Sequence, residues 1–199
     1  MQEAVDNSLP LLIMTQIPNF ISHYYERDIG AFKSMTDNGH KKAKEIFSAL
    51  KQTGKSAKSK FPDSYIDLRK EVETWLQAEF IKRGGQPKRQ NPIYTILGTC
   101  DWLLDWYENG AKETLLLSTL EGKQVSFTYP DSMISYQLFS QKEDIGIKYD
   151  MKEHYGRVYL LDELHDTISK YGLPKGELRN GRPDFDMYIE MQIWEDIKS

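Results

Sequence analysis

The chain has 199 residues, of which 39% are apolar and 28% charged, and its net charge is -4. This length fits one ordinary domain, and the apolar fraction is too high for a disordered chain. No apolar run approaches the roughly 18 residues of a membrane span, and the early apolar patch 9–14 lacks the basic flank of a secretory signal. We therefore expect a soluble, cytoplasmic protein without a membrane partner. A single cysteine, Cys100, excludes an internal disulfide and a thiolate zinc cluster.

Charge is distributed unevenly along the chain. Residues 27–89 hold 15 Lys and Arg against 8 Asp and Glu, whereas the remainder holds 11 against 22. A basic segment can bind nucleic acid, but this one lacks the interleaved aromatic residues of a base-stacking surface. We favour solvated helix faces here, and nucleic-acid binding remains the alternative.

The first half of the chain predicts one strand and two helices. Residues 10–25 are β-branched and aromatic and predict a strand that ends in a polar turn. From Asn38 apolar residues recur at helical spacing, and the basic sequence GKSAKSK predicts a flexible loop after them. The clearest helix is predicted from Asp63, as its capping residue, to Arg83. Its apolar stripe consists of Leu68, Val72, Trp75, Leu76 and Phe80.

The second half predicts mainly short strands. A strand over 91–97 precedes a short aromatic helix that ends near Asn109, and two strands, 114–117 and 124–129, are separated by a hairpin-type turn signal. A polar loop, a fourth strand and a capped helix that stops at Gly172 come next. An alternating strand near the C-terminus completes the series. The polar loop spans residues 141–155, the fourth strand 157–160 and the last strand 186–194.

These elements do not follow a regular strand–helix–strand order. We therefore expect one α+β domain over residues 1–199, with a mixed, mainly antiparallel sheet packed by three to four helices. Flexible loops are expected near 53–61 and 141–155, and the second of these is expected to order on binding.

Several familiar chemistries lack their motifs. The chain has no GxGxxG, Walker, GxSxG, HExxH or EF-hand pattern. The four histidines are scattered, and no spacing indicates a metal site, so we assign none. Cys100 begins an aromatic segment and is better explained as a small buried residue than as a nucleophile.

Polar residues at two strand ends are the best candidates for a site. His23 ends the first strand, with Tyr25 on its face and Tyr24 on the other. In the last strand, the residues Tyr188, Glu190, Gln192 and Trp194 share one face, opposite the aliphatic Ile189, Met191 and Ile193. This polar and aromatic face either meets solvent or lines a cleft, and large aromatic surface is better covered than exposed.

The sharpest hypothesis places His23 and Glu190 in one cleft as a catalytic pair, acting as an ion pair or as a general acid and base. Its alternative is a structural contact that joins two strands. The ligand-binding candidates around the pair are Tyr24, Tyr25, Tyr129, Asp131, Ser132, Tyr188, Gln192 and Trp194. The segment that contains Tyr129, Asp131 and Ser132 is expected to be a turn first and a site second.

The chain resembles an uncharacterised bacterial protein family through five motifs. These are SHYYE (22–26), GGxP followed by Pro-x-Tyr (84–94), SFTYxDS (126–132), YGLP (171–174) and YIExQxW (188–194). The resemblance spans nearly the whole chain, but Pro130 stands where the family has glycine, and the family has a shorter loop near 141–155. It implies a single-domain bacterial protein and assigns no activity.

Two classes of function stay open. The first is a binding or interaction protein that takes a small molecule or a protein partner through its aromatic residues. The second is an enzyme, in its most specific form an NAD-using ADP-ribosyltransferase-like site, in which His23, a tyrosine at 129 or 136, and Glu190 occur in that order along the chain. The sequence assigns neither a cofactor nor an oligomeric state.

Overall fold

A six-stranded sheet forms the centre of the computed structural model, which describes residues 17–140, 152–174, 178–179, 182–183 and 187–197. Each strand runs antiparallel to its neighbours, in the order β3-β1-β2-β8-β4-β5. The strands are β1 (Phe20–Glu26), β2 (Ile93–Leu97), β3 (Gly110–Leu116), β4 (Val125–Thr128), β5 (Val158–Leu160) and β8 (Glu190–Ile193). A separate small sheet pairs β6 (Leu178–Arg179) with β7 (Arg182–Pro183). The strand nearest the C-terminus therefore lies in the middle of the main sheet.

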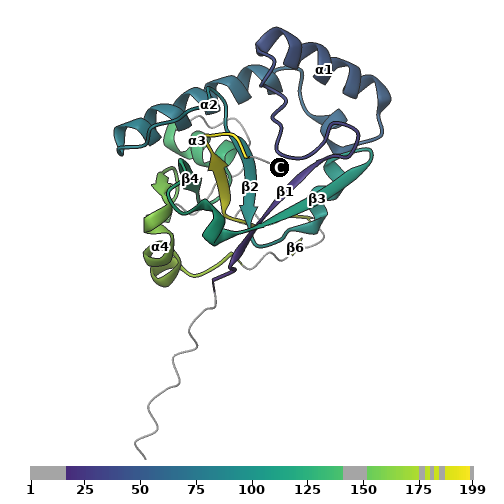
Figure 1. Cartoon of the computed structure of the whole chain (residues 1–199). Helices are drawn as coiled ribbons and strands as arrows, with labels where there is room; N and C mark the ends of the chain where they lie inside the picture. The colour runs from purple at the N-terminus through teal and green to yellow at the C-terminus, as the bar shows by residue number, and fades with distance from the viewer. Residues whose placement is uncertain (1–16, 141–151, 175–177, 180–181, 184–186, 198–199) are drawn as a thin grey trace, which may run out of the picture.

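Helices cover both faces of the sheet (Figure 1). One face carries α2 (Tyr65–Lys82), with α1 (His40–Thr53) and α3 (Ser132–Ser140) packed beside it. The other carries α4 (Leu164–Tyr171). Four short 3-10 helices join these elements: η1 (Ala57–Lys60), η2 (Asp101–Trp106), η3 (Leu117–Leu120) and η4 (Leu161–Glu163). The α+β prediction is confirmed, and none of the described helices is long and apolar enough to cross a membrane.

The last strand is buried on both faces. Its aliphatic face packs under α4, where Met191 and Ile193 meet Leu164 and Ile168. Its polar and aromatic face lies under α2 and α3: Glu190 is 7% exposed and Trp194 is 0% exposed. This face is therefore neither open to solvent nor wholly a cleft, because the apolar stripe of α2 covers Trp194 and the amide of Gln192 bonds Ser126 and Thr128 of β4.

The turn signal between β3 and β4 does not make a hairpin. β3 pairs with β1, whereas β4 pairs with β8 and β5 at the other side of the sheet. The expected pairing is wrong because a local turn motif specifies a change of direction and not the partner strand, and here η3 carries the chain across the sheet.

Three local expectations also differ from the structure. The expected turn over 129–132 leads directly into α3, and Asp131 is the capping residue before that helix: its Oδ1 accepts hydrogen bonds from the backbone N–H groups of Met133 and Ile134. The basic loop contains η1, and Ser64 replaces Asp63 as the residue before α2. Of the 141–155 loop, residues 141–151 lie outside the described residues, as does the start of the first predicted strand.

The phase of α2 gives a stability prediction. Trp75 is 7% exposed and packs against Tyr136 and Phe139, with ring centroids 5.6 and 5.3 Å away, while Lys70 is exposed. Trp75→Ala removes a buried ring and leaves a cavity, so it should cost about 3–5 kcal/mol in urea unfolding. Lys70→Ala is the matched control and should cost less than about 0.5 kcal/mol. Equal losses would contradict the phase of the helix.

Candidate functional site

The site begins where β1 separates from β2. All seven residues of β1 pair with β3, but only Ile21 and Ser22 pair with β2. Beyond Ser22 the two strands diverge, and a cavity of about 540 Å³ extends from the gap to α2, η1 and η2. Its volume is in the ordinary range for small-molecule sites.

His23 occupies the point of divergence. Its Nδ1 lies 2.8 Å from the carbonyl oxygen of Tyr94 on β2, and because a carbonyl only accepts, Nδ1 carries the proton. Nε2 is then unprotonated and carries a lone pair. This atom is buried and has no hydrogen-bond partner among the described residues. The ring stacks on Tyr25 and Phe32 at 5.5 and 5.1 Å. Burial is the main cause that lowers the pKa of His23, and the charge of Lys58 lowers it further. The hydrogen bond to the carbonyl of Tyr94 has the opposite effect on this pKa. The ring is therefore neutral at pH 7.

Two cationic side chains enter the cavity from the helical side. Arg69 of α2 lies over the ring of Tyr94, 4.3 Å from its centroid, and donates to the hydroxyl oxygens of Ser132 and Tyr65 at 3.3 and 3.1 Å. Lys58 of η1 places Nζ 3.9 Å from the centroid of the Tyr107 ring. Both contacts are cation–π interactions, which partly replace the hydration that the cations lose.

The two cations differ in their protonation. Burial lowers the pKa of Lys58 to about 7; the charge of Arg69 contributes to this, and Glu26 opposes it. Burial also disfavours charge on Arg69, but the surrounding phenol oxygens and the carboxylates of Glu190 and Glu73 outweigh it and raise the pKa of Arg69. Arg69 is therefore a permanent cation, and Lys58 titrates near neutral pH.

Two acidic residues of the cavity, Glu190 and Glu26, accept hydrogen bonds from neutral donors. Glu190 Oε1 accepts from Ser132 N and Gln192 Nε2 at 3.3 and 3.1 Å. The two oxygens of Glu26 accept from backbone N–H groups of residues 108 and 109, at 3.0 and 2.9 Å. Within the described part of the chain, neither Lys58 nor Arg69 has a carboxylate within 4.0 Å.

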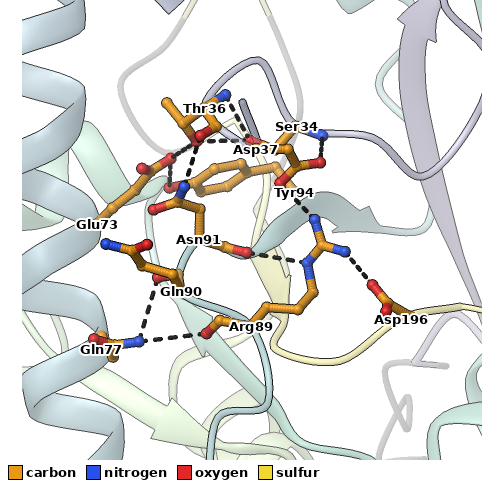
Figure 2. A network of polar contacts seen from close by, with 10 residues as sticks. All are labelled: Ser34, Thr36, Asp37, Glu73, Gln77, Arg89, Gln90, Asn91, Tyr94 and Asp196. Atoms are coloured by element: carbon orange, nitrogen blue, oxygen red, sulfur yellow. Dashed lines mark hydrogen bonds and ion pairs between the residues drawn. The ribbon is translucent and has the colours of Figure 1, made fainter. Parts of the chain in front are cut away.

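The loop between β1 and α1 forms one wall of the cavity, and a polar network fixes its end (Figure 2). Thr36 Oγ1 donates to Glu73 Oε1 at 3.0 Å, and the hydroxyl of Tyr94 donates to the same oxygen at 3.3 Å. Asn91 Nδ2 donates to the carbonyl of Thr36 at 2.8 Å, and Arg89 forms ion pairs with Asp37 and Asp196. Burial raises the pKa of Glu73, an effect that the charge of Arg69 and these two hydroxyl donors reduce. Glu73 therefore joins the loop, β2 and α2 at one side of the cavity.

The carboxylate of Asp131, directly before α3, is close enough to Glu190 of β8 to be affected by its charge. Burial, followed by the charge of Glu190, raises the pKa of Asp131 to about 7, although two backbone N–H groups bind its Oδ1. Burial is the largest cause that raises the pKa of Tyr188, and the charges of Asp131 and Glu190 raise it further. Asp131 is therefore uncharged more readily than an isolated aspartate.

Five of the ten predicted site residues line the cavity: His23, Tyr24, Tyr25, Tyr188 and Glu190. The other five predicted site residues make structural contacts elsewhere. Trp194 donates to Ser126 and stacks on Phe80, Gln192 bonds Ser126 and Thr128, and Tyr129 packs beneath α4. Asp131 caps α3, and Ser132 bonds Arg69 and Glu190.

The structure does not form the expected direct couple between His23 and Glu190. Ser22 pairs with Ile96 and Ile96 with Glu190, so Glu190 lies on the face of Ser22, while His23 leaves β1 toward the opposite face. No hydrogen bond or ion pair joins the two side chains in the described structure; each has the separate partners given above. They share a cavity without touching.

Sequence reasoning missed Lys58, Arg69, Glu73 and Tyr94. For Arg69 and Glu73 a signal existed, because each lies three or four residues from buried positions of α2 and so falls on its covered side. A charged residue at such a position requires a partner or a cavity. Lys58 gave no such signal, since it lies in a short basic segment without periodicity.

Metal binding and cysteine chemistry find no support in this region. Among the described residues no group of three His, Cys, Asp or Glu side chains is placed to hold a metal ion. Cys100 is buried, and burial raises the pKa of its thiol to about 11, which leaves it protonated and unreactive at neutral pH.

Comparison with protein-family models finds no match, and neither a curated protein nor a solved structure matches the chain. Function has to be inferred from the cavity itself.

Asp131 gives a pH prediction. The pKa of Asp131 is about 7 in the folded protein, against the ordinary value of 3.8. As the pH rises, the unfolded chain therefore loses this proton at a lower pH than the folded protein does. The free energy of unfolding falls between about pH 4 and pH 7 as a result. Asp131→Asn keeps an oxygen for the cap and removes the charge. The variant should be more stable than the wild type at pH 8, on the order of 1–2 kcal/mol allowing for partial exposure, and equal to it near pH 3. Urea unfolding at both pH values measures this, and a less stable variant at pH 8 would contradict it.

Proposed function

We propose that this protein binds a small anionic molecule with a flat ring in the cavity between β1 and α2. The observation that carries the proposal is the cation of Arg69, beside the basic side chain of Lys58, in one cavity without a carboxylate at ion-pair distance among the described residues. Buried charges are normally paired, because an unpaired charge loses its hydration without compensation. A bound anion would supply the missing partner.

The geometry of Arg69 supports an oxygen-rich anion. A guanidinium has five N–H donors, and two hydroxyl oxygens take one hydrogen bond each. The remaining donors suit a phosphate or a carboxylate, which guanidinium binds in a two-pronged geometry.

Aromatic walls support a flat ligand. Seven aromatic side chains line the cavity, and rings of this kind stack on planar groups while their hydroxyls fix orientation. They are Tyr24, Tyr25, Tyr65, Tyr94, Trp106, Tyr107 and Tyr188.

The enzyme alternative gains less support. His23 and Glu190 line the cavity, as an NAD-using site of the expected order would require, but Tyr129 packs under α4 and Tyr136 bonds Glu71 beside Trp75. NAD belongs to the class of flat anions that the cavity suits, so it belongs among the ligands tested.

Nucleic-acid binding is also weakened as an alternative. Many basic side chains of residues 27–89 form ion pairs with acidic ones, as at Lys42–Glu45, Lys44–Asp67 and Lys82–Glu79. This arrangement supports solvated faces that hold their own counter-charges.

The proposal is tested by thermal denaturation with matched ligands. The midpoint of thermal unfolding should rise with AMP, NAD, pyridoxal 5′-phosphate and benzoate. It should not rise with adenosine, pyridoxal and benzamide, because only the anions can pair with the charge of Arg69. Arg69→Met should weaken binding about 10- to 100-fold by removing charged hydrogen bonds. Arg83→Met, at an exposed ion pair with Glu163, is the control and should leave binding unchanged. Neutral compounds that stabilise as strongly as their anionic counterparts would contradict the proposal.

A separate measurement addresses nucleic acid. Changing Lys41, Lys42 and Lys82 to glutamate together should leave ligand binding intact. The wild type should show no DNA or RNA binding that persists at physiological salt, because the basic residues are largely compensated. Micromolar binding at that salt, lost in the triple variant, would show that the basic segment is a nucleic-acid surface.

A further inference from the structure

Lys58 differs from the lysines around it. Lys51 and Lys55 form ion pairs at the surface, with Asp63 and Glu108, and Lys60 is exposed. Lys58 is half-buried, lines the cavity and has the ring of Tyr107 against its Nζ. Trp106 is the next ring, 6.0 Å from Nζ. The side chain of Lys58 therefore lines the cavity, with two aromatic rings beside its nitrogen.

The neighbours of Lys58 favour its neutral form. Arg69, a permanent cation in the same cavity, repels a second positive charge, and the aromatic walls remove water that would solvate an ammonium. Glu26, the acidic residue that opposes this effect, has both oxygens bound to backbone N–H groups. A lysine with a pKa of about 7 is a neutral amine in a large fraction of the molecules at neutral pH, and a neutral amine is a nucleophile.

The geometry points to Lys58 as an imine-forming lysine, whose Nζ condenses with an aldehyde or ketone carbonyl of an anionic ligand held by Arg69. The amine lone pair attacks the carbonyl carbon and forms the C–N bond. The carbonyl oxygen then leaves as water with the two hydrogens of the amine, and a C=N bond remains. No oxidant or reductant takes part. This inference rests on the proposed function, because Arg69 selects the anion.

The chemistry narrows the ligand class. A carbonyl compound that also carries a phosphate or carboxylate can place its anion on Arg69 and its carbonyl at Lys58. A ligand without a carbonyl would still bind, with Lys58 as a second cation only.

The test is reductive trapping on the full chain with pyridoxal 5′-phosphate as the probe, an aromatic aldehyde with a phosphate. The protein is incubated with substoichiometric probe near pH 7.5, reduced with borohydride and mapped by peptide mass spectrometry. An ordinary lysine has only about one neutral amine in a thousand at this pH, so label at Lys58 should exceed label at Lys55 and Lys60 at least about 10-fold. Lys58→Arg keeps the charge and removes the amine, so it should abolish this label while retaining probe binding in the thermal assay. Lys60→Arg is the matched control and should change neither.

Label spread evenly over the lysines, or missing from Lys58 while the probe binds, would overturn the imine proposal and leave anion binding standing. Equal labelling of Lys58 by pyridoxal and by its phosphate would instead overturn the role of Arg69. The two failures are therefore distinguishable.

Discussion

The separation of β1 from β2 after Ser22 is the feature on which the rest of the site depends. Strands that diverge leave backbone groups without ladder partners, and such groups are costly unless another donor or acceptor reaches them. His23 supplies this partner for the carbonyl of Tyr94, while β1 keeps its full pairing with β3 on its other edge. The hydroxyl of Tyr107 also donates to the carbonyl of Tyr24 at 2.7 Å, which joins the chain after η2 to the open edge of β1. The gap is thus stabilised from both sides.

Once the gap exists, its lining determines its chemistry. The covered side of α2 supplies Arg69 and Glu73 where a fully packed helix would supply aliphatic residues. Burying a cation costs free energy that aromatic contacts and hydroxyl groups recover only in part. We interpret this unrecovered cost as the physical basis of anion binding, since a ligand that neutralises the charge removes the cost. Burial, followed by repulsion from the charge of Arg69, keeps Lys58 close to its neutral form.

The sequence predicted the class of the fold from the order of its elements, and the phase of α2 and the burial of the aliphatic face of the last strand from periodicity. It could not predict that β4 would pair with β8, since strand pairing depends on contacts between distant segments. It identified His23, Glu190 and three tyrosines as cavity residues because polar groups at strand ends stand out against an apolar run. The direct pairing of His23 with Glu190 failed because the register places them on opposite faces. Lys58 is placed by the packing of η1 against η2, and no pattern in the sequence indicates this contact.

The titration of Lys58 tests the central claim most directly, that Lys58 shares one cavity with the Arg69 cation and has no carboxylate at ion-pair distance among the described residues. The ¹³Cε resonance of Lys58, assigned through Lys58→Arg and followed from pH 5 to 11, gives its pKa in the intact protein. A midpoint near 7 is predicted, with a rise toward the ordinary value in Arg69→Met, because that variant removes the repelling charge. A midpoint near 10.5 in both proteins would show that Lys58 is solvated or paired, and would contradict the account.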